Sequence, residues 1–401
     1  MIEKSKRGNY IILPTENSSK EPGMKKVCII HETGSGRLPG HYTEFAFTGL
    51  PGVEIAALAD PNPDAAEFFF RTGAKKLYTS WQEMIDRERP DITILSSRSV
   101  EDHYIQIKFA LEHGSHVLCE KPLAADLIQA DELIALSQQK GSHVQIAHPA
   151  RFAPVFRKMK TLIEDGAIGR VLTCYMRGKE DHRGGGEDMI VLGTHIFDAA
   201  AWIFGMPVEV MADVRWQNRR ITAKDILPAS EPVGPCAGDE ILAIFRFPDG
   251  ISGIFESRRD VSGPYGEKRL GITVCGTAGS LTIRYTGNRE LRMTKNFPVP
   301  PEDGNAFEVV PVEVPPEIPG AAPIDFAAWK INEKNYALRY FAENNRRAAW
   351  NLLQAIEGRE ELAAGIVSAR NAIEMISGVY RSGIEGRSIT FPLTDRHHPL
   401  L

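Results

Sequence analysis

The sequence has few cysteines and no long apolar run. Only five of its 401 residues are cysteine, and none form a C-x-x-C pair, which argues against a disulfide framework and a cysteine-based zinc site. No stretch approaches about 18 uninterrupted apolar residues, and the charged N-terminus lacks the apolar segment of a signal peptide. We therefore expect a cytoplasmic protein without a membrane partner. Its cysteines should be buried thiols of a reducing compartment: Cys28, Cys119, Cys174, Cys236 and Cys275.

The sequence also lacks an excess of basic residues. Lys and Arg number 47 against 52 Asp and Glu, a formal net charge of −5, so no global positive field exists to bind a phosphate backbone. This predicts no nucleic-acid partner. The 11 histidines form no H-E-x-x-H motif and no Cys/His ligand spacing, so we expect no metal site. Apolar residues at 43% and charged residues at 25% are typical of globular domains and exclude extended disorder.

The length corresponds to two or three domains at about 150 residues each. Residues 1–24 show no sustained period, and Met24 directly precedes the first strand-like run, so we interpret them as an extension or as a start assigned too early. Between residues 25 and 148, short β-branched runs alternate with helical segments such as Leu123–Lys140. This alternation predicts a doubly wound parallel sheet, a Rossmann domain. Its strands are expected at residues 27–31, 53–59, 76–78, 91–96, 116–120 and 143–147.

Residues 149–401 follow another pattern. Longer strand-like runs are separated by turns such as Phe247-Pro248-Asp249-Gly250, which indicates hairpins and an antiparallel sheet. The predicted fold class is therefore α/β followed by α+β: a doubly wound parallel sheet, then a mostly antiparallel sheet with C-terminal helices. The expected strands are 170–178, 208–216, 240–247, 251–257, 271–275 and 280–285, and the expected helices are 153–165, one from about 187, 333–357 and 361–383.

A glycine-rich turn follows the first strand, at Gly34, Ser35, Gly36 and Arg37. Its G-x-G-x-x-x-G spacing is an imperfect version of the turn whose backbone N–H groups bind a pyrophosphate, and a plain turn is the alternative. The second strand ends at Asp60, 26 residues after Gly34, near the spacing of the acid that binds the adenine ribose. A carboxylate there favours NAD, although Asp60 could be a helix cap. Arg37 could receive a 2′-phosphate, so NADP is not excluded.

The fifth strand ends in Glu120-Lys121-Pro122. Ligands of a doubly wound sheet bind outside the carboxyl ends of its strands, and Lys121 lies at such an end. Ser96, at the end of the fourth strand, is expected to line the cofactor cleft for the same reason. An ammonium beside a nicotinamide can hydrogen-bond a reacting hydroxyl oxygen and orient its carbon for hydride transfer. A surface lysine at the start of a helix is the alternative.

His195 is the second candidate for chemistry. It lies in the helix expected from about Glu187, after the run Gly184–Gly186, whose glycines would let a ligand come close. An imidazole is suited to accept a hydroxyl proton near neutral pH. The residues alone equally allow a histidine buried in the core.

Five segments occur in a telling order and spacing: Gly114–Ala124 with its Glu-Lys-Pro, Ala147–Pro154, Gly193–Asp198, Gly276–Leu281 and Tyr380–Pro392. Together they resemble the Gfo/Idh/MocA oxidoreductases, a family typified by glucose–fructose oxidoreductase and inositol dehydrogenase. The resemblance spans roughly residues 25 to 395. It implies an NAD(P)-dependent enzyme that transfers a hydride between the cofactor and a secondary alcohol of a sugar, cyclitol or related polyol. It also implies a homo-oligomer, a dimer or a tetramer.

The resemblance also implies roles for single residues. Lys121 and His195 would be catalytic, and Glu120 would contact the cofactor unless it orients Lys121. Arg151 would bind substrate, with a domain-interface salt bridge as the alternative, and so would Thr194 of the matched histidine motif. Residues 149–401 would form the domain that binds substrate and forms oligomers.

One family feature is missing, because the aspartate found one helical turn before the histidine in many members is Val191 here. Asp188, one turn further back on the same face, or the acids Glu180 and Asp181, would then orient His195 near the substrate.

Two other functions stay open. NAD could remain bound and be reduced and reoxidised within one cycle, so that the net reaction is glycoside cleavage, elimination or epimerisation. The chain could also be a non-catalytic cofactor-binding regulator. The presence of Lys121 and His195 argues against the regulator, because a sensor needs neither.

Overall fold

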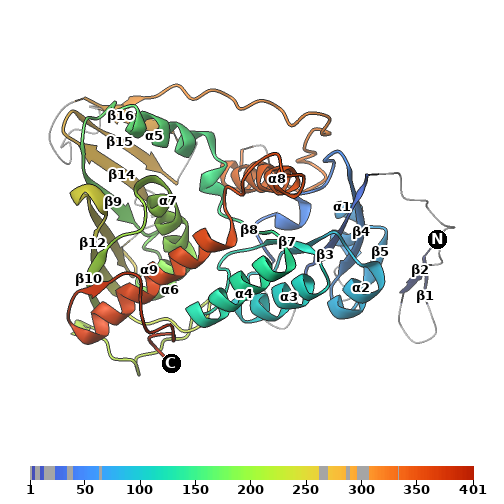
Figure 1. Ribbon diagram of the computed structural model, residues 1–401, viewed down its shortest axis with the longest axis horizontal. Coiled ribbons are helices and arrows are strands. Elements are labelled where there is room, and N and C mark those ends of the chain that lie inside the picture. The colour runs from blue at the N-terminus through green and yellow to red at the C-terminus, as the bar shows by residue number, and fades with distance from the viewer. Residues whose placement is uncertain are drawn as a thin grey trace.

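The computed structural model describes residues 2–4, 10–12, 23–33, 39–62, 66–261, 270–285, 290–295, 307–332 and 334–401. After a short hairpin of β1 (Ile2–Lys4) and β2 (Tyr10–Ile12), six parallel strands form a sheet in the order β5-β4-β3-β6-β7-β8 (Figure 1). This is the doubly wound order predicted from the sequence. The strands are β3 (Lys25–Ile30), β4 (Val53–Ala59), β5 (Lys76–Tyr78), β6 (Ile92–Leu95), β7 (His116–Cys119) and β8 (Val144–Ile146).

Four helices connect these strands: α1 (Ala66–Thr72), α2 (Trp81–Glu88), α3 (Val100–Glu112) and α4 (Leu127–Lys140). The helix predicted to begin at Leu123 starts four residues later. Asp126 sets that start, because its carboxylate accepts a hydrogen bond from the N–H of Gln129 at 2.8 Å and caps the helix. Leu123 is nevertheless buried in the core. Its apolar side chain is therefore explained by burial and does not indicate a helix.

The second sheet has the strand order β11-β10-β12-β13-β9-β14-β15-β16-β17, with β18 beside β10. Only β13 and β9 pair in parallel among these strands, so the sheet is mostly antiparallel, as predicted. The strands are β9 (Val171–Arg177), β10 (Glu209–Trp216), β11 (Arg219–Arg220), β12 (Glu240–Arg246), β13 (Ser252–Arg258), β14 (Gly271–Gly276), β15 (Gly279–Arg284), β16 (Leu291–Thr294), β17 (Glu308–Val309) and β18 (Ile389–Thr390).

Helices cover one face of this sheet. α9 (Ile366–Glu385) packs against β10 and against α7 (Thr194–Phe204), as Figure 1 shows. α7 continues the short helix α6 (Gly186–Asp188) through a π turn at Met189–Gly193. α5 (Pro154–Glu164) lies near β15 and β16. The predicted helix from about residue 187 is therefore present, but its period changes in the middle.

α8 (Tyr336–Ile356) joins the two halves of the molecule. Although it follows the antiparallel sheet in sequence, its Ala348 and Leu352 pack into the core formed by the parallel sheet. Asn345 donates a hydrogen bond to the carbonyl of His41 at 2.8 Å, and Arg346 donates to the carbonyl of Thr48 at 2.9 Å. The division of the chain near residue 148 stays a prediction, and a helix from the later part completes the earlier domain.

All five cysteines are buried free thiols. Among the described helices, none combines the length and apolar character needed to cross a membrane.

Candidate active site

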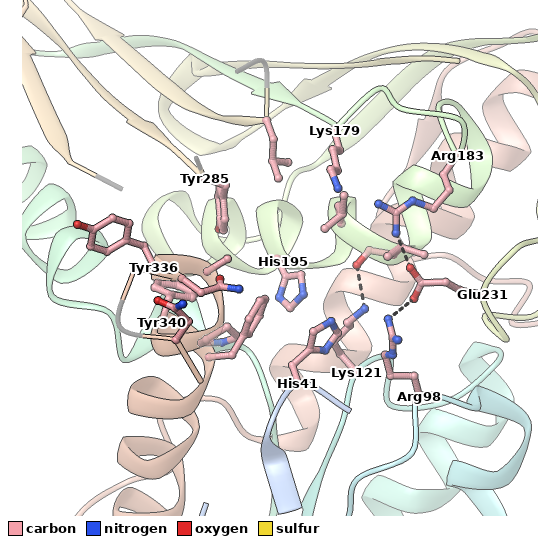
Figure 2. Close-up of a pocket in the computed structure, with 18 of the residues that line it drawn as sticks. His41, Arg98, Lys121, Lys179, Arg183, His195, Glu231, Tyr285, Tyr336 and Tyr340 are labelled. Atoms are coloured by element: carbon pink, nitrogen blue, oxygen red, sulfur yellow. Dashed lines mark hydrogen bonds and ion pairs between the residues drawn. The ribbon is translucent and has the colours of Figure 1, made fainter. Parts of the chain in front are cut away.

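A cavity of about 670 Å³ opens where the parallel strands end, between the two sheets. Its walls include the turns after strands of the parallel sheet, the segment between β9 and α7, the start of α8, and residues of the antiparallel-sheet half such as Glu231 and Tyr285 (Figure 2). Its polar lining includes His41, Arg98, Lys121, Lys179, Arg183, His195, Glu231, Asn332, Lys334 and Asn335, with Tyr285, Tyr336 and Tyr340. The cavity therefore contains both predicted catalytic residues.

Lys121 lies two residues after β7 and is only 1% exposed. Its Nζ donates a hydrogen bond to the carbonyl oxygen of Val191 at 3.0 Å (Figure 2). Burial lowers the pKa of Lys121, while the carboxylates of Glu231 and Glu120 raise it. The ammonium is thus held by a backbone carbonyl, and donor capacity remains on the cavity side.

His195 lies in the first turn of α7 and points into the same cavity (Figure 2). Its side chain is buried, and among the described residues its Nδ1 has no hydrogen-bond partner. Burial, and then the positive charge of Lys121 and the ring of His148, lower the pKa of His195 well below its usual value. The imidazole is therefore neutral at neutral pH and able to accept a proton.

The π turn explains how the position of the missing aspartate is used. Val191 lies within the turn, its side chain lines the cavity, and its carbonyl holds Lys121. π turns often occur at functional sites, where the extra residue redirects backbone and side chains. Here the backbone carbonyl at position 191 provides a contact to the lysine.

Asp188 does not line the cavity. Its carboxylate accepts the N–H groups of Lys179 and Glu180, both at 3.1 Å, and the hydroxyl of Ser257 at 2.6 Å. Burial raises the pKa of Asp188, and the hydrogen bond from Ser257 opposes that rise. The expectation that Asp188 shares a face with His195 assumed 3.6 residues per turn, which the π turn interrupts. In the structure it anchors the loop that carries Lys179.

Arg151 also lies apart from the cavity lining. It makes two hydrogen bonds to the carboxylate of Asp198, each 2.8 Å long, and donates to the carbonyl of Ala363 at 2.9 Å. Nδ1 of His148 lies 3.1 Å from Asp198 as well. Although burial opposes it, His148 and Arg151 hold the pKa of Asp198 well below its usual range. This salt bridge lies within residues 149–401, not between the two predicted domains, and it supports the helix that carries His195. A substrate contact of Arg151 stays a prediction.

The remaining predicted residues near this wall are buried. Thr194 begins α7 and is not part of the cavity lining. Ser96 donates to the carbonyl of Ile30 at 3.2 Å and is covered by Gly40, where a Cβ would stand 2.3 Å from the Ser96 carbonyl oxygen. Only glycine fits at position 40 for that reason.

Glu120 forms hydrogen bonds with two residues of the connection between β3 and β4. It accepts the N–H of His41 at 2.8 Å and the hydroxyl of Thr43. Burial disfavours its charge, but His41 and Lys121 hold the pKa of Glu120 well below its usual range. Glu120 therefore positions His41, which lines the cavity, and supplies negative charge close to Lys121.

At the cofactor end, Gly34, Ser35, Gly36 and Arg37 lie outside the described residues. Asp60 lies directly after β4, as predicted. It accepts hydrogen bonds from Nδ1 of His31 at 2.7 Å, from the hydroxyl of Thr33 at 2.8 Å and from the N–H of Asn62 at 2.9 Å. Although burial opposes it, these donors hold the pKa of Asp60 below its usual value.

Several residues that line the cavity were not predicted from the sequence. Arg98 lies three residues after the end of β6, so the rule that selected Ser96 could have reached it. Arg183 is part of the run Lys179–Arg183, which we searched only for acids. Glu231, which accepts from both arginines, lies in the connection between β11 and β12, where no pattern marks it.

Two models of one family match the chain. One, described as "Oxidoreductase family, NAD-binding Rossmann fold", matches residues 26–148, and the other, "GFO/IDH/MocA C-terminal domain", matches residues 156–282. They cover more than half of the chain and include Lys121 and His195. The chain belongs to the Gfo/Idh/MocA oxidoreductase family.

Two of the curated relatives that the chain matches are named as dehydrogenases. Levoglucosan dehydrogenase of Pseudarthrobacter phenanthrenivorans is 27% identical over 275 residues, 62% of this chain and 69% of the relative. The scyllo-inositol 2-dehydrogenase (NAD(+)) of Bacillus subtilis is 23% identical over 348 residues, 84% of this chain and 92% of the relative.

Solved structures agree on the fold. A complex of levoglucosan dehydrogenase with NADH and L-sorbose matches with a TM-score of 0.69 at 20% identity, covering 92% of this chain and 99% of the other. The aldose-aldose oxidoreductase of Caulobacter crescentus, complexed with glycerol, matches with a TM-score of 0.66 at 20% identity, covering 92% and 100%.

The described residues fit the NAD of this family. Asp60 stands where an acid binds the adenine ribose, although the ribose hydroxyls would compete with the donors that already bind its carboxylate. At the other end, the buried ammonium of Lys121 and the imidazole of His195 line the cavity. Among the described residues, no group of three His, Cys, Asp or Glu side chains is arranged to hold a metal ion.

Proposed function

We propose that this protein is an NAD-dependent dehydrogenase that acts on a secondary alcohol of a sugar, cyclitol or related polyol. One observation carries the proposal: the buried side chains of Lys121 and His195 line the same cavity, at the strand ends where NAD-binding folds place their ligand. The names of the two curated relatives, which act on levoglucosan and scyllo-inositol, support the substrate class.

The chemistry follows from the two side chains. Lys121 donates a hydrogen bond to the substrate oxygen and stabilises the negative charge that grows there as the proton leaves. His195, whose lowered pKa leaves the ring unprotonated at neutral pH, accepts the hydroxyl proton. NAD, when bound, accepts the hydride from the carbon. The carbonyl of Val191 keeps the ammonium from moving away from the oxygen.

A panel of polyols and aldoses tests the proposal, with NAD or NADP as cofactor and NADH or NADPH absorbance as the readout. We expect turnover with NAD, and Lys121→Ala should lower it by about a hundredfold while a cofactor titration still shows binding. Lys224→Ala, at an exposed lysine outside the cavity, is the matched control.

The outcomes separate the alternatives. An unchanged rate in Lys121→Ala would remove the lysine from the mechanism. Conversion of substrate without NADH release, by protein that retains its cofactor through purification, would favour transient oxidation with a net cleavage, elimination or epimerisation. Cofactor binding without any conversion would favour a regulator.

We also propose a homo-oligomer, a dimer or a tetramer. The face of the large sheet opposite α7 and α9 exposes Met211 and Ile244, which pair across β10 and β12 and are 56% and 44% exposed. Neighbouring exposed apolar side chains on a sheet face favour contact with a second copy. Light scattering during size-exclusion chromatography should give at least twice the 44.4 kDa chain mass, and a monomer would contradict this proposal. The cytoplasmic location stays a prediction.

A further inference from the structure

The cavity is basic in a chain that is acidic. The protein has a formal net charge of −5, yet Lys and Arg side chains contribute five of the charges that line the cavity, and Glu231 is the one carboxylate among the described lining residues. Two histidines, His41 and His195, line it as well. A neutral polyol does not require such an excess of cations, because hydroxyl groups are recognised by uncharged donors and acceptors.

The basic wall belongs to the loop between β9 and α6. Lys179 and Arg183 project from this loop into the cavity on the side of the antiparallel sheet (Figure 2). The loop is held by buried groups: Asp188 accepts the N–H of Lys179, and Ser257 accepts the N–H of Gly185 at 2.9 Å. The backbone that presents the two cations is therefore built into the fold.

The carboxylates nearby only partly balance these cations. Asp181 lies 2.7 Å from Arg183 and 3.4 Å from Lys179, and Glu231 lies 2.8 Å from Arg98 and also contacts Arg183. In these ion pairs three cations share two carboxylates, and the buried carboxylates of Glu180 and Asp188 lie behind the cavity lining.

Lys121 and Lys334 add two further positive charges. Lys121 bonds to the carbonyl of Val191, and the charge of Glu120, which does not line the cavity, partly balances it. Lys334 adds its charge at an exposed position of the lining.

The cofactor's own phosphates do not account for the cations of this wall. In a doubly wound domain the pyrophosphate binds at the turn after the first strand, which belongs to the parallel sheet. Lys179 and Arg183 come from the other domain and face the part of the cavity that holds Lys121 and His195. An anionic group that binds to these two side chains would therefore belong to the substrate.

We infer that the substrate is an anionic polyol, a sugar acid or a sugar phosphate, whose oxyanion group binds to Lys179 and Arg183 while its hydroxyl lies at Lys121 and His195. This inference rests on the proposed function and narrows its substrate class. Charge-assisted hydrogen bonds to a carboxylate or phosphate are stronger than neutral ones, so the group would contribute both affinity and orientation.

Titration calorimetry with NADH-loaded protein tests the inference. The probes are three matched sets, in which glucose, galactose and mannose are each compared with their uronic acid and their 6-phosphate. In at least one set an anionic member should bind about tenfold more tightly than its neutral sugar. Uronic acids and phosphates form separate arms, so the preferred arm identifies the source of the charge. Added salt should reduce the difference in affinity between the anionic and the neutral sugar.

Variants locate the anion site. Lys179→Gln removes the charge and keeps most of the side chain, and it should abolish most of the preference, whereas the exposed Lys224→Gln should leave it unchanged. Equal or weaker binding of every anionic member, or a preference unaffected by Lys179→Gln, would overturn the inference. NADH formation from the same sugars with NAD is the separate test of the proposed function. Turnover of neutral sugars alone would support the dehydrogenase function and overturn the inference of an anionic substrate. Preferred binding of an anionic sugar without NADH formation would support the anion site and contradict the dehydrogenase function.

Discussion

Val191→Asp restores the carboxylate that many family members carry, and it perturbs the proposed base in a defined direction. Val191 precedes His195 by four residues, is buried, and lines the same cavity. In the native protein, burial and the charge of Lys121 keep the pKa of His195 well below its usual value. A negative charge nearby stabilises the protonated imidazole and therefore raises this pKa.

The size of the effect follows from the distance between the two charges. Because the π turn interrupts the α-helical period, we take about 6 Å as the order of distance between two side chains that line one cavity. At an effective dielectric constant of about 20, one charge at that distance contributes about 3 kcal/mol, or about two pKa units. Lys121 also attracts the new carboxylate, so we expect a shift of about one to two units.

The assay is the pH dependence of kcat/KM. His195 must be neutral to accept a proton, so activity falls as pH drops through its pKa, and this acid-side limb should move to higher pH in Val191→Asp. Val191→Asn is the matched control, because it has the same shape without the charge and should leave the limb in place. If Val191→Asp folds, shown by an unchanged circular dichroism spectrum, and its limb does not move, His195 is not the base.

Three further predictions concern the residues around the site. Asp188→Asn places an amide N–H group against the donors of Lys179, Glu180 and Ser257. It should therefore raise the substrate KM and leave the pH profile of kcat unchanged. A shifted pH profile would show that Asp188 takes part in the proton transfer. Asp60→Ala should weaken NAD binding by about tenfold in a fluorescence titration, and an unchanged Kd would exclude a ribose contact. Arg151→Met leaves the Asp198 carboxylate buried without its bidentate partner and should reduce the free energy of unfolding by about 3–5 kcal/mol in urea; a loss below about 1 kcal/mol would contradict that role.

The sequence predicted the parts of the fold that depend on local pattern. The six strands of the parallel sheet lie where short β-branched runs were found, and the turn at Phe247–Gly250 joins β12 to β13. Lys121 was placed in the cavity by a positional rule alone, because the carboxyl ends of parallel strands converge. Such features depend on neighbours in the chain or on a rule of the fold.

Other features depend on contacts between distant residues, which a pattern does not encode. The π turn at Met189–Gly193 changes the helical period between Asp188 and His195. Counting residues therefore could not predict whether the two side chains lie on one face of the helix. The packing of α8 on the earlier domain and the placement of Glu231 between Arg98 and Arg183 arise only when the chain has folded. The contact between Arg151 and Asp198, which lie 47 residues apart in the chain, is of the same kind.

A crystal structure of the dead-end complex with NADH and the best alcohol from the substrate panel is the most direct test of the central claim. The account predicts that the Nζ atom of Lys121 and a ring nitrogen of His195 both lie about 3 Å from one hydroxyl oxygen of the substrate, beside the nicotinamide. A complex in which either nitrogen is turned away from that oxygen, or bonds to a different part of the substrate, would contradict it.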